Sequence, residues 1–130
     1  MAPSLLLLFN HEPTPSQLED AFRTLGVSLV EHPPQEIRRL WQSVPPELER
    51  IGGYLKPIAE WVSSVARAGD FILIQGDFGA TWLMVNLAFE GGLIPVYSTT
   101  ERKAVEEAVE DGTVKLSHQF KHVRFRKYGE

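Results

Sequence analysis

Four short apolar runs alternate along the chain with segments whose apolar residues recur at helical spacing. Such runs are typical of strands buried on both faces, whereas a period of about 3.6 residues is typical of helices. The predicted strands are Leu5–Phe9, Val27–Val30, Phe71–Ile74 and Ile94–Ser98. The predicted helices cover residues 15–25, 35–44, 47–67 and 80–89, with a break expected in the third at Gly52-Gly53 and Pro57.

The segment after Thr100 allows two interpretations. Residues 101–110 have the composition of a helix, yet Asp111-Gly112 lies between Val109 and Val114, which is a strong hairpin signal. Beyond this dipeptide, residues 113–128 alternate in the manner of a strand. We favour a hairpin over a helix followed by a strand.

The order of these elements predicts an α/β domain. Strand–helix–strand units place parallel strands in one sheet with helices on both faces, and right-handed crossovers restrict the topology to a Rossmann-like arrangement. At 130 residues, the chain has the size of one domain. We therefore predict one domain over residues 1–130, with a mostly parallel sheet and a C-terminal β-hairpin.

Composition excludes several kinds of chemistry. The chain has no cysteine, so disulfides, thiolate catalysis and thiolate metal sites are excluded. We expect neither a metal nor a cofactor. The Leu5–Phe9 run lacks the flanks of a signal peptide, and no run is long enough to span a membrane. We expect a cytoplasmic protein without membrane contact.

The charge argues against one class of partner. A net charge of −4 disfavours tight binding to long nucleic acid. The charge is unevenly placed, because residues 113–128 carry five lysines and arginines and no acidic residue. This end of the chain is therefore expected to attract anions.

The turn Gln75–Thr81 joins an apolar strand to an apolar helix. Gly76 and Gly79 permit close backbone approach, and the N–H groups at the helix N-terminus favour an anion. The turn is neither a Walker A loop nor a GxGxxG fingerprint. Asp77 would repel a phosphate, but it suits a ribose hydroxyl or an N-cap. A plain capped turn is the alternative to a ligand site.

Two other strand ends are candidates, because ligands of open α/β sheets bind beyond the carboxyl ends of the strands. Asn10-His11 follows the first strand, and we expect it beside Gly76. The segment Thr99-Thr100-Glu101-Arg102-Lys103 follows the fourth strand, and its hydroxyls and cations suit a phosphodiester. Turn residues, an N-cap and solvated charge explain both segments without a ligand.

Period two predicts which side chains of the last strand share a face. One face is expected to carry Phe120, His122, Arg124, Arg126 and Tyr128, and the other to pack Val123 and Phe125 on the core. Hydrogen-bond donors flanked by aromatic rings suit phosphates and stacked bases. An edge strand protected by charge is the alternative.

The helix over residues 80–89 has Asn86 as its only interior polar residue, so no face of it suits water. Either its own domain covers it, or it lies in a dimer interface. We favour a homodimer with a site shared across the twofold axis. Trp41 and Trp61, at helical spacing with neighbouring apolar residues, are expected in the core.

The sequence resembles a small CRISPR-associated family in four segments, which occur in the family's order: LLLLFNH, LIQGDFGATWLMVN, PVYSTTERK and FKHVRFRKY. The members are CARF-type (CRISPR-associated Rossmann fold) ring nucleases of type III CRISPR systems. The resemblance covers nearly the whole chain. It implies a dimeric protein that binds a cyclic oligoadenylate, with cyclic tetra-adenylate as the expected ring, and switches off antiviral signalling by cleaving it.

The resemblance also implies a metal-independent reaction in which a ribose 2′-hydroxyl attacks its own 3′-phosphate and leaves a 2′,3′-cyclic phosphate. The expected catalytic residues are His11, Asp77 and Arg124. The expected ligand-binding residues are Asn10, His11, Gln75, Gly76, Asp77, Phe78, Gly79, Ala80, Thr81, Thr99, Thr100, Arg102, Lys103, His122, Arg124 and Arg126. Two other functions stay open: a non-cleaving sensor or sponge for the same ligand, and a protein-interaction module.

Overall fold

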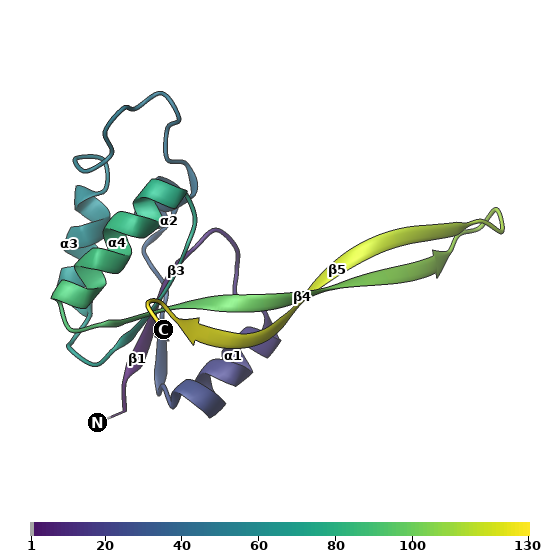
Figure 1. Cartoon of the computed structure of the whole chain (residues 1–130), viewed down its shortest axis with the longest axis horizontal. Coiled ribbons are helices and arrows are strands. Elements are labelled where there is room, and N and C mark those ends of the chain that lie inside the picture. The colour runs from purple at the N-terminus through teal and green to yellow at the C-terminus, as the bar shows by residue number, and fades with distance from the viewer. Residues whose placement is uncertain (1) are drawn as a thin grey trace.

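The computed structural model describes residues 2–130, and the elements follow one another in the predicted order (Figure 1). The strands are β1 (Ser4–Phe9), β2 (Leu29–Glu31), β3 (Phe71–Gln75), β4 (Ile94–Ala108) and β5 (Val114–Lys127). The helices are α1 (Pro15–Asp20), continued by a π-helical turn (Ala21–Leu25), α2 (Gln35–Gln42), α3 (Lys56–Val65) and α4 (Phe78–Glu90).

The strands form one sheet in the order β2-β1-β3-β4-β5. Neighbours among β1 to β4 are parallel, and β5 runs antiparallel to β4. Phe9 of β1 pairs with Gln75 of β3, so the ends of these two strands lie side by side as expected. The prediction of an α/β domain with a mostly parallel sheet and a C-terminal hairpin is confirmed.

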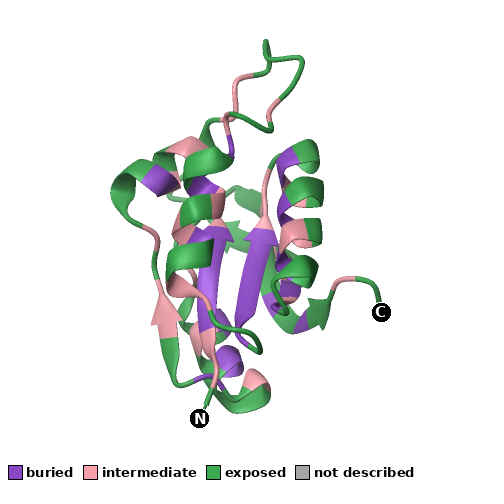
Figure 2. Cartoon of the chain, turned by 90° about the vertical axis from the view of Figure 1, so that its left-hand side faces the viewer, coloured by how far each residue is buried: buried purple, intermediate pink, exposed green. Residues whose placement is uncertain are grey.

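Helices cover both faces of the sheet, which explains the consecutive apolar residues of β1. Leu6 and Leu8 pack with α2, α3 and α4, whereas Leu5 and Leu7 pack with the π-helical turn after α1. Alternate side chains of a strand point to opposite faces, so a strand covered on both sides must be apolar throughout. Figure 2 shows β1 and β3 buried between the helices. Trp41 lies in the core as predicted, and Trp61 packs against it.

The third predicted helix is shorter than expected. Residues 47–55 form turns and irregular structure, and α3 begins only at Lys56. Pro57 is tolerated there because the first turn of a helix has no use for its missing N–H group. The hydroxyl of Tyr54 donates to the carbonyl oxygens of Leu40 and Ser43, at 2.5 and 3.1 Å, and closes this loop against α2.

α4 is covered on one side only, so of the two alternatives for this helix, complete cover by its own domain does not hold. Ala80, Met84 and Ala88 face the sheet and are buried. The exposed fractions of Phe78, Trp82 and Phe89 are 96%, 66% and 51%. An apolar stripe on this helix therefore has no cover within residues 2–130. No helix of the described chain is long and apolar enough to cross a membrane.

β4 and β5 form the favoured hairpin, but β4 is longer than predicted. It pairs with β3 only from Ile94 to Val96, and with β5 as far as Ala108. Beyond the sheet, the two strands continue alone as a ribbon that projects from the body (Figure 1). Residues 99–103 therefore lie inside a strand, and the prediction that they follow a strand ending at Ser98 is wrong.

A β-bulge in β5 changes the predicted faces of the last strand. Thr99 pairs with Arg124 and Thr100 with His122, so Val123 is the extra residue. His122 and Phe125 consequently share a face, with their ring centroids 4.7 Å apart. Phe125 is buried as predicted, but Val123 is 56% exposed, so the prediction that it packs on the core is wrong. His122 does not share a face with Arg124, which is a second correction.

Candidate functional site

The turn after β3 is closed by Asp77, which caps α4. Its Oδ2 atom accepts a hydrogen bond from the backbone N–H of Ala80 at 3.0 Å, and its carbonyl oxygen accepts from the N–H of Thr81 at 2.8 Å. This cap starts the helix at Phe78, ahead of the predicted start. Asp77 therefore has the N-cap role that was one of its two predicted uses, and one of its carboxylate oxygens forms the capping hydrogen bond.

The two glycines of the turn serve packing within the chain. A Cβ atom at Gly76 would lie 2.9 Å from the indole of Trp41, and one at Gly79 would lie 3.4 Å from Cδ1 of Ile51. The Trp41 indole N–H donates to the carbonyl oxygen of Gln75 at 3.1 Å, which holds the ring against the turn. A close approach is thus present at Gly76, where it is made by a core side chain, whereas the contact at Gly79 is an ordinary van der Waals one.

Replacing Gly76 with alanine is expected to lower the free energy of unfolding by about 1–3 kcal/mol, because the new methyl group overlaps a buried indole. Gly53→Ala is the matched control, since a Cβ atom there meets nothing within 4 Å. Urea unfolding of both variants measures the difference. Equal midpoints would contradict the packing described for Trp41.

A hollow of about 320 Å³ opens beside this turn, between the N-terminus of α4 and the β4–β5 pair. It is lined by Gln75, Gly76, Phe78, Thr81, Tyr97 and Tyr128. The rings of Tyr97 and Tyr128 lie 4.8 Å apart, and the Tyr128 hydroxyl donates to the carbonyl oxygen of Ile74 at 2.5 Å. Burial, with a contribution from Tyr97, raises the pKa of Tyr128, so the phenol stays neutral at physiological pH.

One hydroxyl of the hollow is unused. The Thr81 Oγ1 atom is buried and has no hydrogen-bond partner within residues 2–130. Buried polar atoms are nearly always hydrogen-bonded, so this unpaired oxygen is an exception within the described residues, but it is not itself exposed to the hollow.

Two arginines stand on the same face as Tyr97, because Tyr97 pairs with Arg126 and Thr99 with Arg124. The Arg126 guanidinium carbon lies 5.7 Å from the Tyr97 ring centroid, and its Nη1 atom donates to the Tyr97 hydroxyl at 3.3 Å. Thr99 Oγ1 donates to the Arg124 carbonyl at 3.0 Å and accepts from the Arg124 N–H at 3.2 Å. Of the predicted donor row, Arg126 therefore contacts the Tyr97 wall of the hollow, and Arg124 lies next along the same face.

The other predicted site residues lie elsewhere. His11 packs edge-on against Phe9, with ring centroids 5.5 Å apart, and lines a separate cavity of about 30 Å³ with His32 and Arg38. The carbonyl oxygen of Asn10 accepts from Gln42. The remaining three, Thr100, Arg102 and Lys103, lie along the ribbon, with Thr100 and Arg102 on the face opposite to Thr99.

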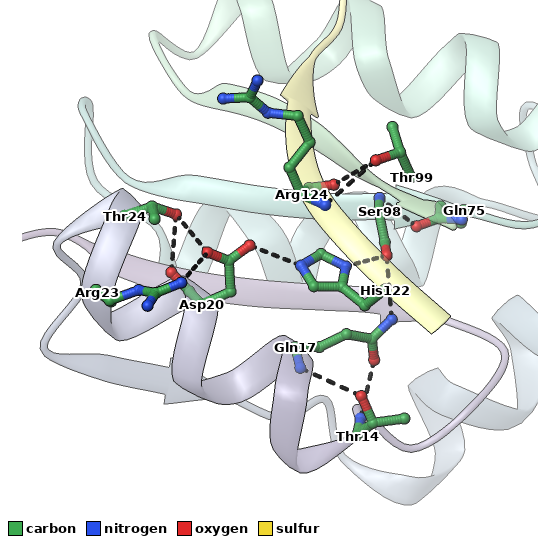
Figure 3. A network of polar contacts seen from close by, with 10 residues as sticks. All are labelled: Thr14, Gln17, Asp20, Arg23, Thr24, Gln75, Ser98, Thr99, His122 and Arg124. Carbon is green, nitrogen blue, oxygen red and sulfur yellow. Dashed lines mark hydrogen bonds and ion pairs between the residues drawn. The ribbon is translucent and has the colours of Figure 1, made fainter. Parts of the chain in front are cut away.

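His122 belongs to a buried polar network that joins α1 to β4 and β5 (Figure 3). Its Nε2 atom lies 2.7 Å from Oδ2 of Asp20, and its Nδ1 atom lies 2.5 Å from the hydroxyl of Ser98. Gln17 donates to the same hydroxyl at 3.2 Å. Both ring nitrogens of His122 and the hydroxyl of Ser98 therefore have hydrogen-bond partners within the network.

The residues Asp20, His122 and Ser98 are those of a serine hydrolase triad, but they are not placed for that chemistry. Ser98 is 8% exposed and enclosed by Gln17 and His122, so a substrate cannot reach its hydroxyl. The network instead contacts one wall of the hollow. The backbone N–H of Ser98 donates to Oε1 of Gln75 at 2.7 Å, and this bond fixes a side chain that lines the hollow.

The sequence interpretation missed Asp20, Gln17 and Ser98. One signal was available, since the polar residues at positions 17, 20 and 24 recur at helical spacing. Their partner could not be identified from this spacing, because His122 lies far away in the sequence.

The Asp20 carboxyl makes the stability of the fold sensitive to acid. Burial acts to raise its pKa, but hydrogen bonds from His122 and Thr24, with the charges of His122 and Arg23, outweigh burial and hold the pKa below the ordinary 3.8. A carboxyl of this kind stabilises the folded state above its unfolded pKa, and this contribution is lost as the pH falls through the folded pKa.

We therefore expect the urea midpoint of the unchanged protein to fall as the pH drops below about 4. In Asp20→Asn, which has no carboxyl to protonate here, the midpoint is expected to change less over the same range. Urea titrations of both proteins between neutral and acid pH test this expectation. Parallel curves would contradict it.

Comparison with known proteins gives one family. The family model described as "Uncharacterized protein MJ1673 family" matches residues 3–126. The chain belongs to this family. A relative of the same name, MJ1673 of Methanocaldococcus jannaschii, is 46% identical over 126 residues, which cover 97% of each chain. No solved structure matches the chain.

The family gives no chemistry for the site, so its function rests on geometry. Within residues 2–130, no group of three or more histidine and acidic side chains is placed to hold a metal ion. The groups at the hollow are aromatic rings, guanidinium groups, an amide and a hydroxyl.

Proposed function

We propose that the chain is a ring nuclease that binds cyclic tetra-adenylate in the hollow beside α4 and cleaves it. The observation that carries this proposal is the combination of Tyr97, Tyr128 and Phe78 with Arg124 and Arg126 around the N-terminus of a helix. Aromatic faces stack on bases, guanidinium groups pair with phosphates, and a helix N-terminus favours an anion.

The hollow is too small for a whole cyclic tetranucleotide, so each hollow would hold only part of the ligand. About 320 Å³ is room for one nucleoside, not for a ring of four nucleotides. Two copies of the hollow around a twofold axis would serve a symmetric ring better than one. We therefore include the homodimer in the proposal, with the fold as a CARF-type Rossmann-like domain.

The exposed stripe of α4 supports such a dimer. Phe78 and Trp82 begin this stripe at the end of the helix that borders the hollow, and Phe89 ends it. Burying large aromatic side chains against a second copy is strongly favourable, and twofold contacts are the commonest kind in homo-oligomers. A contact through α4 would bring two Gln75–Thr81 turns toward one ligand.

The proposed reaction needs no metal. The ribose 2′-oxygen forms a bond to the adjacent phosphorus, the bond from phosphorus to the 5′-oxygen breaks, and the products are a 2′,3′-cyclic phosphate and a 5′-hydroxyl. The 2′-hydroxyl proton passes to Asp77, and the leaving 5′-oxygen takes a proton from water, because His11 lines a separate cavity and does not reach the hollow. Arg124 stabilises the charge that develops on the phosphorane.

His122 has no role in this scheme, because it is only 9% exposed and holds Ser98 behind the sheet. Gln75 and Thr81 contact the ligand from the wall of the hollow. Phe78 and Tyr97 stack on a base.

Incubation of the purified protein with cyclic tetra-adenylate and EDTA, followed by chromatography of the products, tests the proposal. We expect linear products with 2′,3′-cyclic phosphate ends. Intact ligand that stays bound to the protein would overturn the nuclease and indicate a sensor or sponge. No interaction would overturn both and leave a protein-interaction module.

A further inference from the structure

The ribbon formed by β4 and β5 beyond the sheet is amphipathic. Residues opposite one another in an antiparallel pair share a face. One face carries the pairs Arg102–Phe120, Ala104–His118, Glu106–Leu116 and Ala108–Val114. The other face carries Glu101–Lys121, Lys103–Gln119, Val105–Ser117 and Glu107–Lys115. The first face therefore holds the large apolar side chains of the ribbon, and the second is mostly charged.

The apolar face lies open to solvent within the chain. Phe120 is 71% exposed, and Leu116 and Val114 are exposed to a similar degree. Two strands with no further strand or helix on them are at best marginally stable in water. The ribbon is thus expected to be held by a partner, because nothing in residues 2–130 covers this face.

The residues on this face are arranged so that two copies of the ribbon, running in opposite directions, present complementary side chains to each other. Consider a twofold axis that runs across the ribbon, from β4 to β5, at the Ala104–His118 pair. It would place the Arg102–Phe120 pair of one copy over the Glu106–Leu116 pair of the second copy. Arg102 of one copy would then stand over Glu106 of the second copy, and Phe120 over Leu116. Ala104 at the centre is small enough to let the two ribbons approach closely.

We propose that the ribbon is a self-association surface, on which the β4–β5 ribbon of a second copy packs face to face and antiparallel. Opposite charges meet twice and apolar side chains meet twice in this arrangement, and the charged faces stay in water. A copy in the parallel direction would instead place β4 over β5 of the second copy, with Arg102 over Phe120 and Glu106 over Leu116, so that neither charge meets an opposite charge. The charge pattern therefore selects both the partner and its direction.

This surface is distinct from the exposed stripe of α4, and it does not depend on the proposed nuclease function. Two different twofold contacts on one chain build assemblies larger than a dimer. If both form, loss of the ribbon contact would leave dimers; if only the ribbon contact forms, its loss would leave monomers.

Charge exchange tests the proposal, with the molar mass measured by light scattering after gel filtration. In Arg102→Glu, two glutamates of different copies meet, and the mass is expected to fall about twofold. Glu106→Arg is expected to have the same effect. The double variant Arg102→Glu/Glu106→Arg restores the opposite charges and with them the original mass.

Lys103→Glu is the matched control, because it changes the next residue of the same strand on the opposite face. It is expected to leave the mass unchanged. The proposal is overturned if Arg102→Glu keeps the mass of the unchanged protein, or if the double variant fails to restore it. Because no ligand is present in this experiment, its outcome is separate from that of the cleavage assay.

Discussion

Replacing Asp20 with alanine is expected to lower the free energy of unfolding by about 1–3 kcal/mol, the range typical of leaving a buried hydrogen-bonding group without its partner. Asp20 accepts from His122 across the interface between α1 and β5, and His122 is 9% exposed. Without the carboxylate, the imidazole keeps a buried N–H group with no partner. The free energy of unfolding falls because the desolvation of this N–H group is no longer compensated by a hydrogen bond.

Glu19→Ala is the control for this change, since Glu19 is the preceding residue of α1 and is exposed. It is expected to change the free energy of unfolding by less than about 0.5 kcal/mol. Denaturant unfolding measures both variants. A loss below about 1 kcal/mol in Asp20→Ala would show that the network does not hold α1 to the sheet.

Replacing Arg124 with alanine is expected to slow cleavage of cyclic tetra-adenylate by about 10²–10³-fold, as found when one group that stabilises transition-state charge is removed. Arg124 is exposed on the face of Tyr97, and in Figure 3 its side chain points away from the buried network. The fold should therefore tolerate its loss. Single-turnover rates at saturating protein separate this effect from weaker binding.

Lys115→Ala is the control for Arg124→Ala, because it removes a cation from the far end of β5. Its rate is expected to equal that of the unchanged protein. If Arg124→Ala also cleaves at the unchanged rate, Arg124 has no part in the chemistry, and the charge must be stabilised by another group.

The strands and the covered helix faces were predictable because buried positions are apolar and recur along the sequence with a spacing typical of each element. The run at Leu5–Leu8 is apolar at every position since β1 has helices on both sides, and this alone placed it inside a parallel sheet. The first helix was correctly expected to end at residue 25, and Gly26, which follows it, adopts the left-handed conformation that favours glycine.

The faces of β5 were not predictable beyond the bulge. A single extra residue at Val123 reverses the alternation, and nothing in the local sequence distinguishes it from a regular position. The same holds for the network, in which Asp20 and His122 meet only after the sheet has formed. The strand ends and the turn at Asp77 were found from the sequence, whereas Tyr97 and Tyr128 were not recognised as walls of the hollow.

The proposed function requires that the cyclic nucleotide bind in the hollow beside α4. Amide hydrogen exchange of the protein with and without cyclic tetra-adenylate tests this location most directly. We predict slower exchange in residues 75–82, 97–99 and 124–128, with no change near His32. Unchanged exchange at the hollow, or protection confined to the cavity beside His11 and His32, would contradict the account.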